Sequence, residues 1–128
     1  MKLLPKEIEA VSLLDPFKRY QYFIKKVADS EVMYTLIGID NEIAVSEIDN
    51  QSLIPFWSAP EFVEQSKQNG WENLEIKEID LDYFENTLID YIETENLLLN
   101  IFSVNHKTGF VVSLEEFRRD LDEELENY

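Results

Sequence analysis

Apolar side chains recur every three or four residues in four stretches of the chain, which is the spacing of an amphipathic helix. The first stretch begins at Asp15 and Pro16. An aspartate at the N-cap accepts from free N–H groups, and a proline at the first helical position leaves no N–H unpaired. The pattern predicts helices over about residues 15–29, 58–69, 80–92 and 113–125, with either a shorter helix or an arm in residues 1–14.

Two of these helices begin with a serine followed three residues later by a glutamate. Ser58 with Glu61, and Ser113 with Glu116, have the spacing of a capping box, in which the serine oxygen accepts from the backbone of the first turn. Gly70 is expected to end the helix that starts after Ser58, because glycine adopts the left-handed conformation without a steric penalty.

Shorter stretches between the helices have the residue pattern of strands. Residues 32–39 and 43–48 are rich in β-branched residues and flank an Asp-Asn turn, which predicts a hairpin. Residues 53–56 predict a third short strand. Pro55 has no N–H to donate, so we expect this strand at an edge of the sheet, or the proline at its end.

The strands of the second half differ in polarity. Residues 74–79 alternate apolar and charged side chains, which predicts a strand with one face in solvent. Residues 97–102 are almost all apolar, as in a central strand covered on both faces, and a turn at 105–109 returns the chain along 110–112. We therefore expect one α+β domain over residues 1–128, with a mostly antiparallel sheet of about five to six strands flanked by about four helices.

Charge limits the kinds of partner that the chain can bind. It has 27 acidic and 11 basic side chains and a formal net charge of −16, which argues against nucleic acid and anionic membranes and favours a basic protein. Residues 1–30 hold six basic and four acidic side chains, so the other 98 residues carry a net charge of −18. The 45% apolar content argues against disorder, the other common reason for so high a charge.

Neither a leader nor a membrane span is evident in the sequence. Charges and a proline stand where a signal peptide would have its apolar stretch, and no window approaches the about 20 apolar residues of a membrane helix. The chain has no cysteine, so we expect neither disulfides nor thiolate metal sites. These features predict a cytoplasmic protein.

Four segments in order give the chain a family resemblance: residues 17–29; 55–57 followed by 61–62 and 70–71; 79–84; and 109–112 leading into an acidic helix. Over roughly residues 17–126 the chain resembles a small bacterial family known as domain of unknown function 2750. The resemblance implies a single compact bacterial domain. It brings no catalytic residues, because the family has no established activity.

Sequence motifs for catalysis or cofactor binding are absent. Asp80 and Asp82 could offer carboxylates to a divalent cation, but position 6 of an EF-hand loop from Asp80 is Glu85, and a helix N-cap explains Asp80 better. The single histidine, His106, lies in a predicted turn without a nucleophile elbow or metal-ligand spacing around it. We therefore expect no enzyme activity, no cofactor and no metal.

The acidic helices are the strongest candidate for a binding surface. Their carboxylates either keep the protein soluble or bind lysine and arginine side chains of a partner. Acids at the end of the last helix favour the second interpretation, because the helix dipole disfavours them there. The predicted partner-binding acids are Asp82, Glu85, Asp90, Glu93, Glu115, Glu116, Asp120, Glu123 and Glu124.

Two tryptophans flank the second predicted helix. Trp57 and Trp71 either line a pocket for a ligand or a partner's side chain, as tryptophans do at binding hot spots, or pin the helix to the sheet. We include both in the predicted partner-binding set. The alternative function is a housekeeping domain that binds a small molecule or regulates another protein through an aromatic pocket near these residues.

Size, acidity and the absence of catalytic motifs together predict a non-enzymatic interaction protein. Its most concrete form is an immunity-type inhibitor that neutralises a basic effector toxin by electrostatic occlusion. The basic helix over residues 15–29 offsets the acidic body, so we expect a monomer or a weak homodimer between faces of opposite sign.

Overall fold

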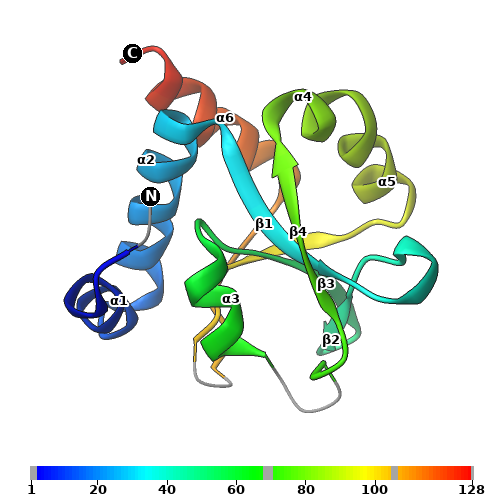
Figure 1. The fold of residues 1–128 in the computed structure, drawn as a ribbon. Coiled ribbons are helices and arrows are strands. Elements are labelled where there is room, and N and C mark those ends of the chain that lie inside the picture. The colour runs from blue at the N-terminus through cyan, green and yellow to red at the C-terminus, as the bar shows by residue number, and fades with distance from the viewer. Residues whose placement is uncertain (1–2, 68–70, 105–106, 128) are drawn as a thin grey trace.

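The computed structural model describes residues 3–67, 71–104 and 107–127 (Figure 1). It is an α+β fold, as predicted, with a four-stranded sheet in the order β2-β3-β5-β6 and a two-stranded sheet of β1 and β4. Two short helical segments, η1 and η2, complete the described elements. The strands are β1 (Val32–Ile37), β2 (Ser46–Ile48), β3 (Gln51–Phe56), β4 (Glu75–Asp80), β5 (Leu98–Ile101) and β6 (Phe110–Val112), and the helical elements are α1 (Pro5–Ser12), α2 (Pro16–Ser30), η1 (Ile39–Asn41), α3 (Pro60–Ser66), α4 (Leu81–Tyr83), η2 (Phe84–Leu88), α5 (Ile89–Thr94) and α6 (Leu114–Leu125).

The long helix α2 begins and ends where local chemistry dictates. The side chain of Asp15 accepts from the backbone N–H of Lys18 at 2.9 Å, so the predicted cap is confirmed. Glu31 adopts a left-handed conformation, φ 62°, and ends the helix. Between these ends one face is buried, including Phe23 and Val27. This face fixes α2 on the core and leaves Lys18, Lys25 and Lys26 exposed, whereas Arg19 is buried and its Nε donates to the Phe102 carbonyl at 3.1 Å.

The hairpin predicted between residues 32–39 and 43–48 forms only beside its turn and does not extend along the two segments. β1 pairs along its whole length with β4, and residues 42–44 make only brief contact with β1, through the Ile37–Ile43 bridge and two backbone hydrogen bonds. β2 pairs with β3 instead. The connecting residues Asp49 and Asn50 both have positive φ, 50° and 66°, as a tight two-residue hairpin turn requires. The extended hairpin of this region is therefore the one formed by β2 and β3.

β3 is an interior strand rather than an edge strand. It lies between β2 and β5 and runs parallel to β5, the one parallel pair among the described strands. The carbonyl of Pro55 accepts from the Thr35 hydroxyl at 2.6 Å on the β1 side. In a strand the nitrogen and the carbonyl of one residue point to the same side, so the Pro55 nitrogen also points away from β5. The missing N–H therefore costs no hydrogen bond between β3 and β5. β5 is covered on both faces and pairs with β6, as predicted.

The start of α3 differs from the predicted capping box. Pro60 occupies the first helical position, so Ala59 is the N-cap and makes no side-chain cap bond. The hydroxyl of Ser58 has no hydrogen-bond partner, and the Glu61 carboxylate accepts from the backbone N–H of Leu3 at 3.2 Å. The helix ends at Ser66, before the predicted end. Gly70 lies outside the described residues.

The helix that follows Asp80 contains a π-helical turn. Asp80 caps it by accepting from the Tyr83 backbone N–H at 2.7 Å. The segments α4, η2 and α5 follow one another without a break, and the wider turn at η2 brings Ile89 to the buried side together with Leu88. Phe84 packs edge-on against Phe56 of β3 and Phe117 of α6. This aromatic group joins the helix, the sheet and α6 in one core.

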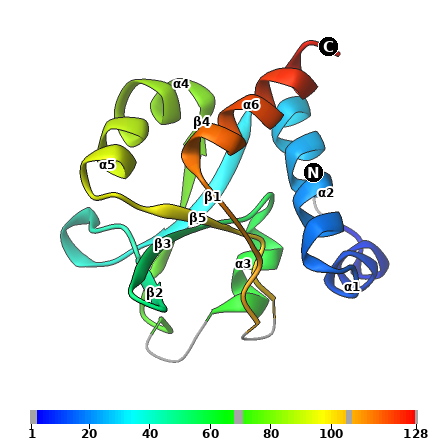
Figure 2. The same ribbon diagram turned by 180° about the vertical axis from the view of Figure 1, so that it is seen from behind.

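Helix α6 lies between α2 and the α4–α5 helix, as the two opposite views show (Figures 1 and 2). Its buried residues Phe117 and Leu121 face the core. The rest of its surface is free to carry charge. Across the described part of the chain, none of the helices is both long and apolar enough for a membrane span.

Candidate protein-binding face

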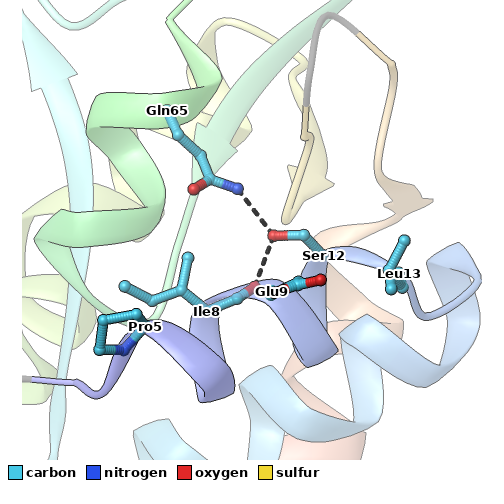
Figure 3. Close-up of a pocket in the computed structure, with 6 residues that line it drawn as sticks. All are labelled: Pro5, Ile8, Glu9, Ser12, Leu13 and Gln65. Atoms are coloured by element: carbon cyan, nitrogen blue, oxygen red, sulfur yellow. Dashed lines mark hydrogen bonds between the residues drawn. The ribbon is translucent and has the colours of Figure 1, made fainter.

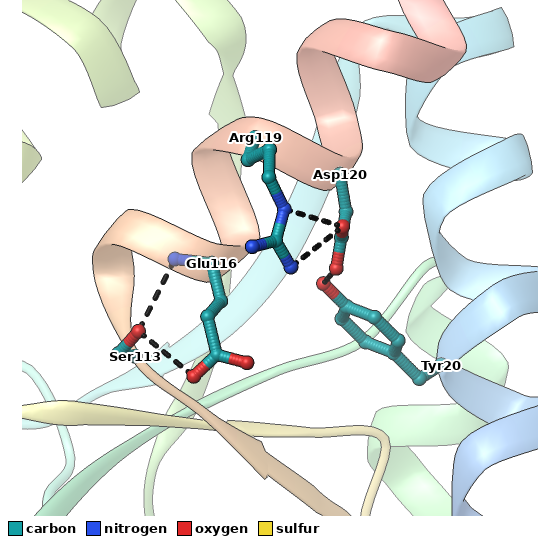
Figure 4. Close-up of polar contacts among 5 residues, drawn as sticks. All are labelled: Tyr20, Ser113, Glu116, Arg119 and Asp120. Carbon is teal, nitrogen blue, oxygen red and sulfur yellow. Dashed lines mark hydrogen bonds and ion pairs between the residues drawn. The ribbon is translucent and has the colours of Figure 1, made fainter.

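Helix α6 positions most of the predicted acidic residues. Ser113 accepts from the backbone N–H of Glu116 at 3.1 Å, and its hydroxyl donates to Glu116 Oε1 at 3.2 Å (Figure 4). The predicted serine cap is therefore confirmed, although the glutamate bonds the serine side chain and not its backbone. Since Phe117 and Leu121 point inward, the carboxylates of α6 project to its two flanks and outer side.

Two grooves run along the flanks of α6. The α5–α6 groove has a volume of about 630 Å³ and the α2–α6 groove about 470 Å³. The first is lined by Ile92, Glu93, Asn96, Leu97, Leu98, Ser113, Leu114, Glu115, Arg118 and Asp122, and the second by Phe17, Tyr20, Gln21, Ile24, Lys25, Phe110, Glu116, Arg119, Asp120 and Glu124.

The α5–α6 groove combines apolar residues with an acidic rim. Leu97, Leu98 and Leu114 supply apolar surface, and three carboxylates surround it. Its one lysine or arginine, Arg118, lies 3.5 Å from Glu85 Oε2, which links α6 to the helix opposite. The groove can thus offer a partner both apolar surface, which loses its water on binding, and negative charge.

The α2–α6 groove has an aromatic floor. The rings of Phe17 and Phe110 are 5.4 Å apart, and those of Tyr20 and Phe110 are 4.8 Å apart. The Tyr20 hydroxyl donates to Asp120 Oδ2 at 2.6 Å, and Arg119 donates to the other carboxylate oxygen at 3.4 Å (Figure 4). Asp120 therefore joins the two walls of the groove.

Tyr20 is held in its protonated form. Burial raises its pKa well above the ordinary value, and the hydrogen bond to Asp120 and the negative charges of Asp120 and Glu116 raise it further. The phenol consequently acts as a hydrogen-bond donor and not as a base at neutral pH.

The structure divides the predicted acidic residues into four groups. Glu93 and Glu115 line the α5–α6 groove, while Glu116, Asp120 and Glu124 line the α2–α6 groove. Glu85 pairs with Arg118 between the helices. The remaining three residues are exposed and line neither groove: Asp82, Asp90 and Glu123.

The two tryptophans do not form the predicted pocket. Trp57 is 0% exposed, and its indole N–H donates to the Ser103 carbonyl at 2.9 Å, so it belongs to the core and cannot touch a partner. Trp71 is half-buried against the core. Neither residue lines either groove beside α6.

Sequence reasoning missed the aromatic residues that do reach the surface. Phe17 is 50% exposed although it shares the apolar spacing of α2, because the first turn of the helix extends past the edge of the core. Phe110 belongs to an edge strand, β6. The rings of Phe17 and Phe110 come into contact because α2 packs over β6, and no local pattern in the sequence indicates this packing.

A third hollow lies between α1 and α3, with a volume of about 390 Å³ (Figure 3). There the Gln65 amide donates to the Ser12 hydroxyl at 2.7 Å, and that hydroxyl donates to the Ile8 carbonyl at 2.7 Å. These hydrogen bonds join α3 to α1. The Ser12 hydroxyl and the Gln65 amide are therefore used within the protein, to hold α3 on α1.

Within the described ranges, no group of three or more histidine, cysteine or carboxylate side chains could hold a metal ion. The carboxylate of Asp80 is used as a helix cap, and Asp82, two residues further along the chain, is exposed. His106 lies outside the described residues.

Fold and surface together define a small α+β domain with an acidic last helix set between two grooves. The chain belongs to the DUF2750 family, described as a protein of unknown function, which matches residues 20–121. The predicted resemblance is therefore confirmed. No curated protein matches the chain.

Proposed function

We propose that the chain is a non-enzymatic protein-binding domain whose partner presents a basic surface to α5 and α6. The most concrete form is an immunity-type inhibitor that occludes a basic effector toxin. One observation carries the proposal: exposed carboxylates flank both grooves, while the two arginines of α6 already lie beside carboxylates of this chain, Arg118 beside Glu85 and Arg119 beside Asp120.

The end of α6 supports the same interpretation. Asp122, Glu123 and Glu124 lie in its last turns, and its last turn has no basic residue. Carboxylates at a helix C-terminus face the negative end of the helix dipole and destabilise the helix. A chain that keeps such residues loses stability, which is expected where charge is retained for binding.

Binding would combine long-range attraction with short-range contact. The net charge of −16 steers a basic protein toward the acidic helices and speeds association at low salt. At contact, lysine and arginine side chains pair with the rim carboxylates while apolar side chains cover the leucines of the α5–α6 groove. A toxin whose active site is basic would be blocked without any chemical change.

The test pairs the chain with candidate toxins encoded by neighbouring genes. Growth rescue on co-expression and stopped-flow association rates are measured for the wild type and for two triple variants with equal charge change. The charge-matched control neutralises exposed acids away from α6. We expect the groove variant to associate about tenfold more slowly and the control to resemble the wild type. The groove variant is Glu93→Gln/Glu115→Gln/Asp122→Asn and the control is Glu31→Gln/Glu47→Gln/Glu75→Gln.

Two results would contradict the proposal. The first is a complex that forms equally fast in both triple variants, or whose association rate does not fall as salt rises. The second is a change in the intact mass of the toxin after incubation, because occlusion leaves the toxin covalently unaltered while an enzymatic inhibitor modifies it.

A further inference from the structure

We propose that the α2–α6 groove binds the guanidinium group of an arginine from the basic partner, with the guanidinium stacked on Phe17 and Phe110 and paired with Glu116 and Glu124. This inference rests on the proposed function and deepens it, since it names the residue type that anchors the partner. It concerns a different groove from the one tested above.

The aromatic floor is the first reason. Phe17 is 50% exposed, and its ring meets Phe110 edge-on at 5.4 Å while Phe110 lies against Tyr20 at 4.8 Å. Large exposed aromatic side chains are costly in water, and arginine stacks on such rings more often than lysine does. The floor is therefore suited to a flat cation.

The carboxylates are the second reason. Asp120 already accepts from both Tyr20 and Arg119, and Glu116 Oε1 accepts from the Ser113 hydroxyl at 3.2 Å. Glu116 Oε2 and the Glu124 carboxylate are therefore the acceptors of the groove that can receive a new cation. Glu116 lines the same groove as the rings of the aromatic floor. Guanidinium donates two parallel hydrogen bonds to a carboxylate, which an ammonium group cannot do.

The groove is held open before any partner arrives. The 2.6 Å hydrogen bond from Tyr20 to Asp120 fixes α2 against α6, and Tyr20 is only 3% exposed. A preformed groove avoids the entropic cost of ordering its walls on binding. Arg119 and Lys25 also line the groove, so its own net charge is only slightly negative. The preference for arginine over lysine must therefore come from ring stacking and directed hydrogen bonds in the groove. The net negative charge of the whole chain supplies the long-range attraction.

The experiment uses three small probes and the full chain. N-acetyl-arginine methylamide, its lysine analogue and its citrulline analogue are titrated against the protein, and binding is followed by the NMR signals of the Phe17 and Phe110 rings and the Gln21 amide. We expect saturable shifts with the arginine probe, weaker shifts with lysine and none with citrulline, which has the shape of arginine without its charge.

Two variants and two controls locate the binding. Phe17→Ala and the double variant Glu116→Gln/Glu124→Gln should each weaken arginine binding about three- to fivefold, the effect of one exposed cation–π contact or ion pair. Leu13→Ala removes an 80% exposed apolar side chain just before α2 and should change nothing. Glu93→Gln/Glu115→Gln removes the same charge from the other groove and should also leave binding unchanged. The double glutamine variant keeps every ring in place, so it tests the site even where Phe17→Ala disturbs folding.

Equal shifts with arginine and citrulline would overturn the inference, as would wild-type affinity in both groove variants. The outcome is separable from that of the proposed function. A partner that still binds Phe17→Ala with full affinity but needs Glu93 and Glu115 refutes the arginine anchor alone. Arginine-probe binding in this groove, together with a complex that forms equally fast in both triple variants, refutes the proposed function instead.

Discussion

Tyr20 and Asp120 join the first long helix to the last. The 2.6 Å hydrogen bond between them spans a hundred residues of sequence and sets the separation of the two walls of the α2–α6 groove. Both residues belong to helices whose own ends are fixed by local caps, Asp15 and Ser113. One long-range contact between two locally determined helices thus shapes the groove.

Removing that hydrogen bond should measurably destabilise the fold. Tyr20→Phe keeps the ring packed on Phe110 but deprives Asp120 of a donor, and we expect a loss of about 1 to 2 kcal/mol in the free energy of unfolding. Urea unfolding followed by tryptophan fluorescence measures it. Tyr22→Phe removes the corresponding tyrosine–carboxylate bond to Glu7 on α1, so it should lower the stability by a similar amount while leaving the α2–α6 groove intact. An unchanged unfolding midpoint in Tyr20→Phe would show that water replaces the phenol without loss.

The same tyrosines predict a loss of stability at alkaline pH. Burial raises the pKa of Tyr20 and of Tyr22 in the folded protein, and hydrogen bonds to Asp120 and Glu7 raise both further. The unfolded chain therefore loses these protons first. The stabilisation is complete below about pH 10, the ordinary tyrosine pKa, and falls as pH rises beyond it, by about 1.4 kcal/mol per pH unit for each group.

Urea unfolding at a series of pH values from about 8 to 11 checks this dependence. The double variant Tyr20→Phe/Tyr22→Phe should have a shallower decline above pH 10 than the wild type. Lysine deprotonation affects both proteins alike and cancels in the comparison. Parallel curves would mean that the two phenols titrate alike in the folded and unfolded chains.

Gly109 is required by a close approach of backbone to backbone. A Cβ atom built there would lie 2.1 Å from the Ile101 carbonyl oxygen and 2.7 Å from two carbonyl carbons of the neighbouring strand end. The Gly109 N–H also donates to the Asn100 side chain at 2.8 Å. Gly109→Ala should therefore separate β6 from β5 and cost at least about 3 kcal/mol.

Thermal unfolding of Gly109→Ala beside Gly38→Ala tests this requirement. A Cβ at position 38 would meet a movable leucine side chain, Leu74 Cδ2, at 3.2 Å. The control should therefore lose much less stability. Similar melting temperatures for the two variants would contradict the argument.

Local features of the sequence were sufficient to predict α2, α6, the Asp80 cap and the β5–β6 hairpin. In each, the determining residues are neighbours along the chain, such as Ser113 and Glu116. Pairings between distant segments were not predictable in this way. The partner of β1 is β4, which follows two further strands and a helix in the chain, and the indole of the buried Trp57 donates to the Ser103 carbonyl 46 residues away.

The candidate site shows the same division. The positions of its carboxylates can be predicted from the sequence of α6, because the helical period places them on the flanks of a helix that buries Phe117 and Leu121. Its aromatic floor does not, because the exposure of Phe17 is set by where the core ends and by the position of β6 beneath α2. Phe17 is therefore exposed and Trp57 fully buried, although the residues around each in the sequence do not reveal this difference.

A charge reversal near the end of α6 should separate stability from binding. Glu123 is exposed in the last turns of the helix, where a cation interacts favourably with the dipole and an anion does not. Glu123→Lys should raise the free energy of unfolding by about 0.3 to 1 kcal/mol. If the acidic helix binds a basic partner, the same variant should associate with that partner more slowly.

The control for that variant is Glu47→Lys, which makes the same charge change on β2, away from α6. Urea unfolding and stopped-flow association are measured on both proteins and the wild type. The control should have nearly wild-type association and no dipole-derived gain in stability. A Glu123→Lys variant that is more stable and also binds the partner as fast as the wild type would mean that the acids at this end of α6 are retained for a reason other than binding.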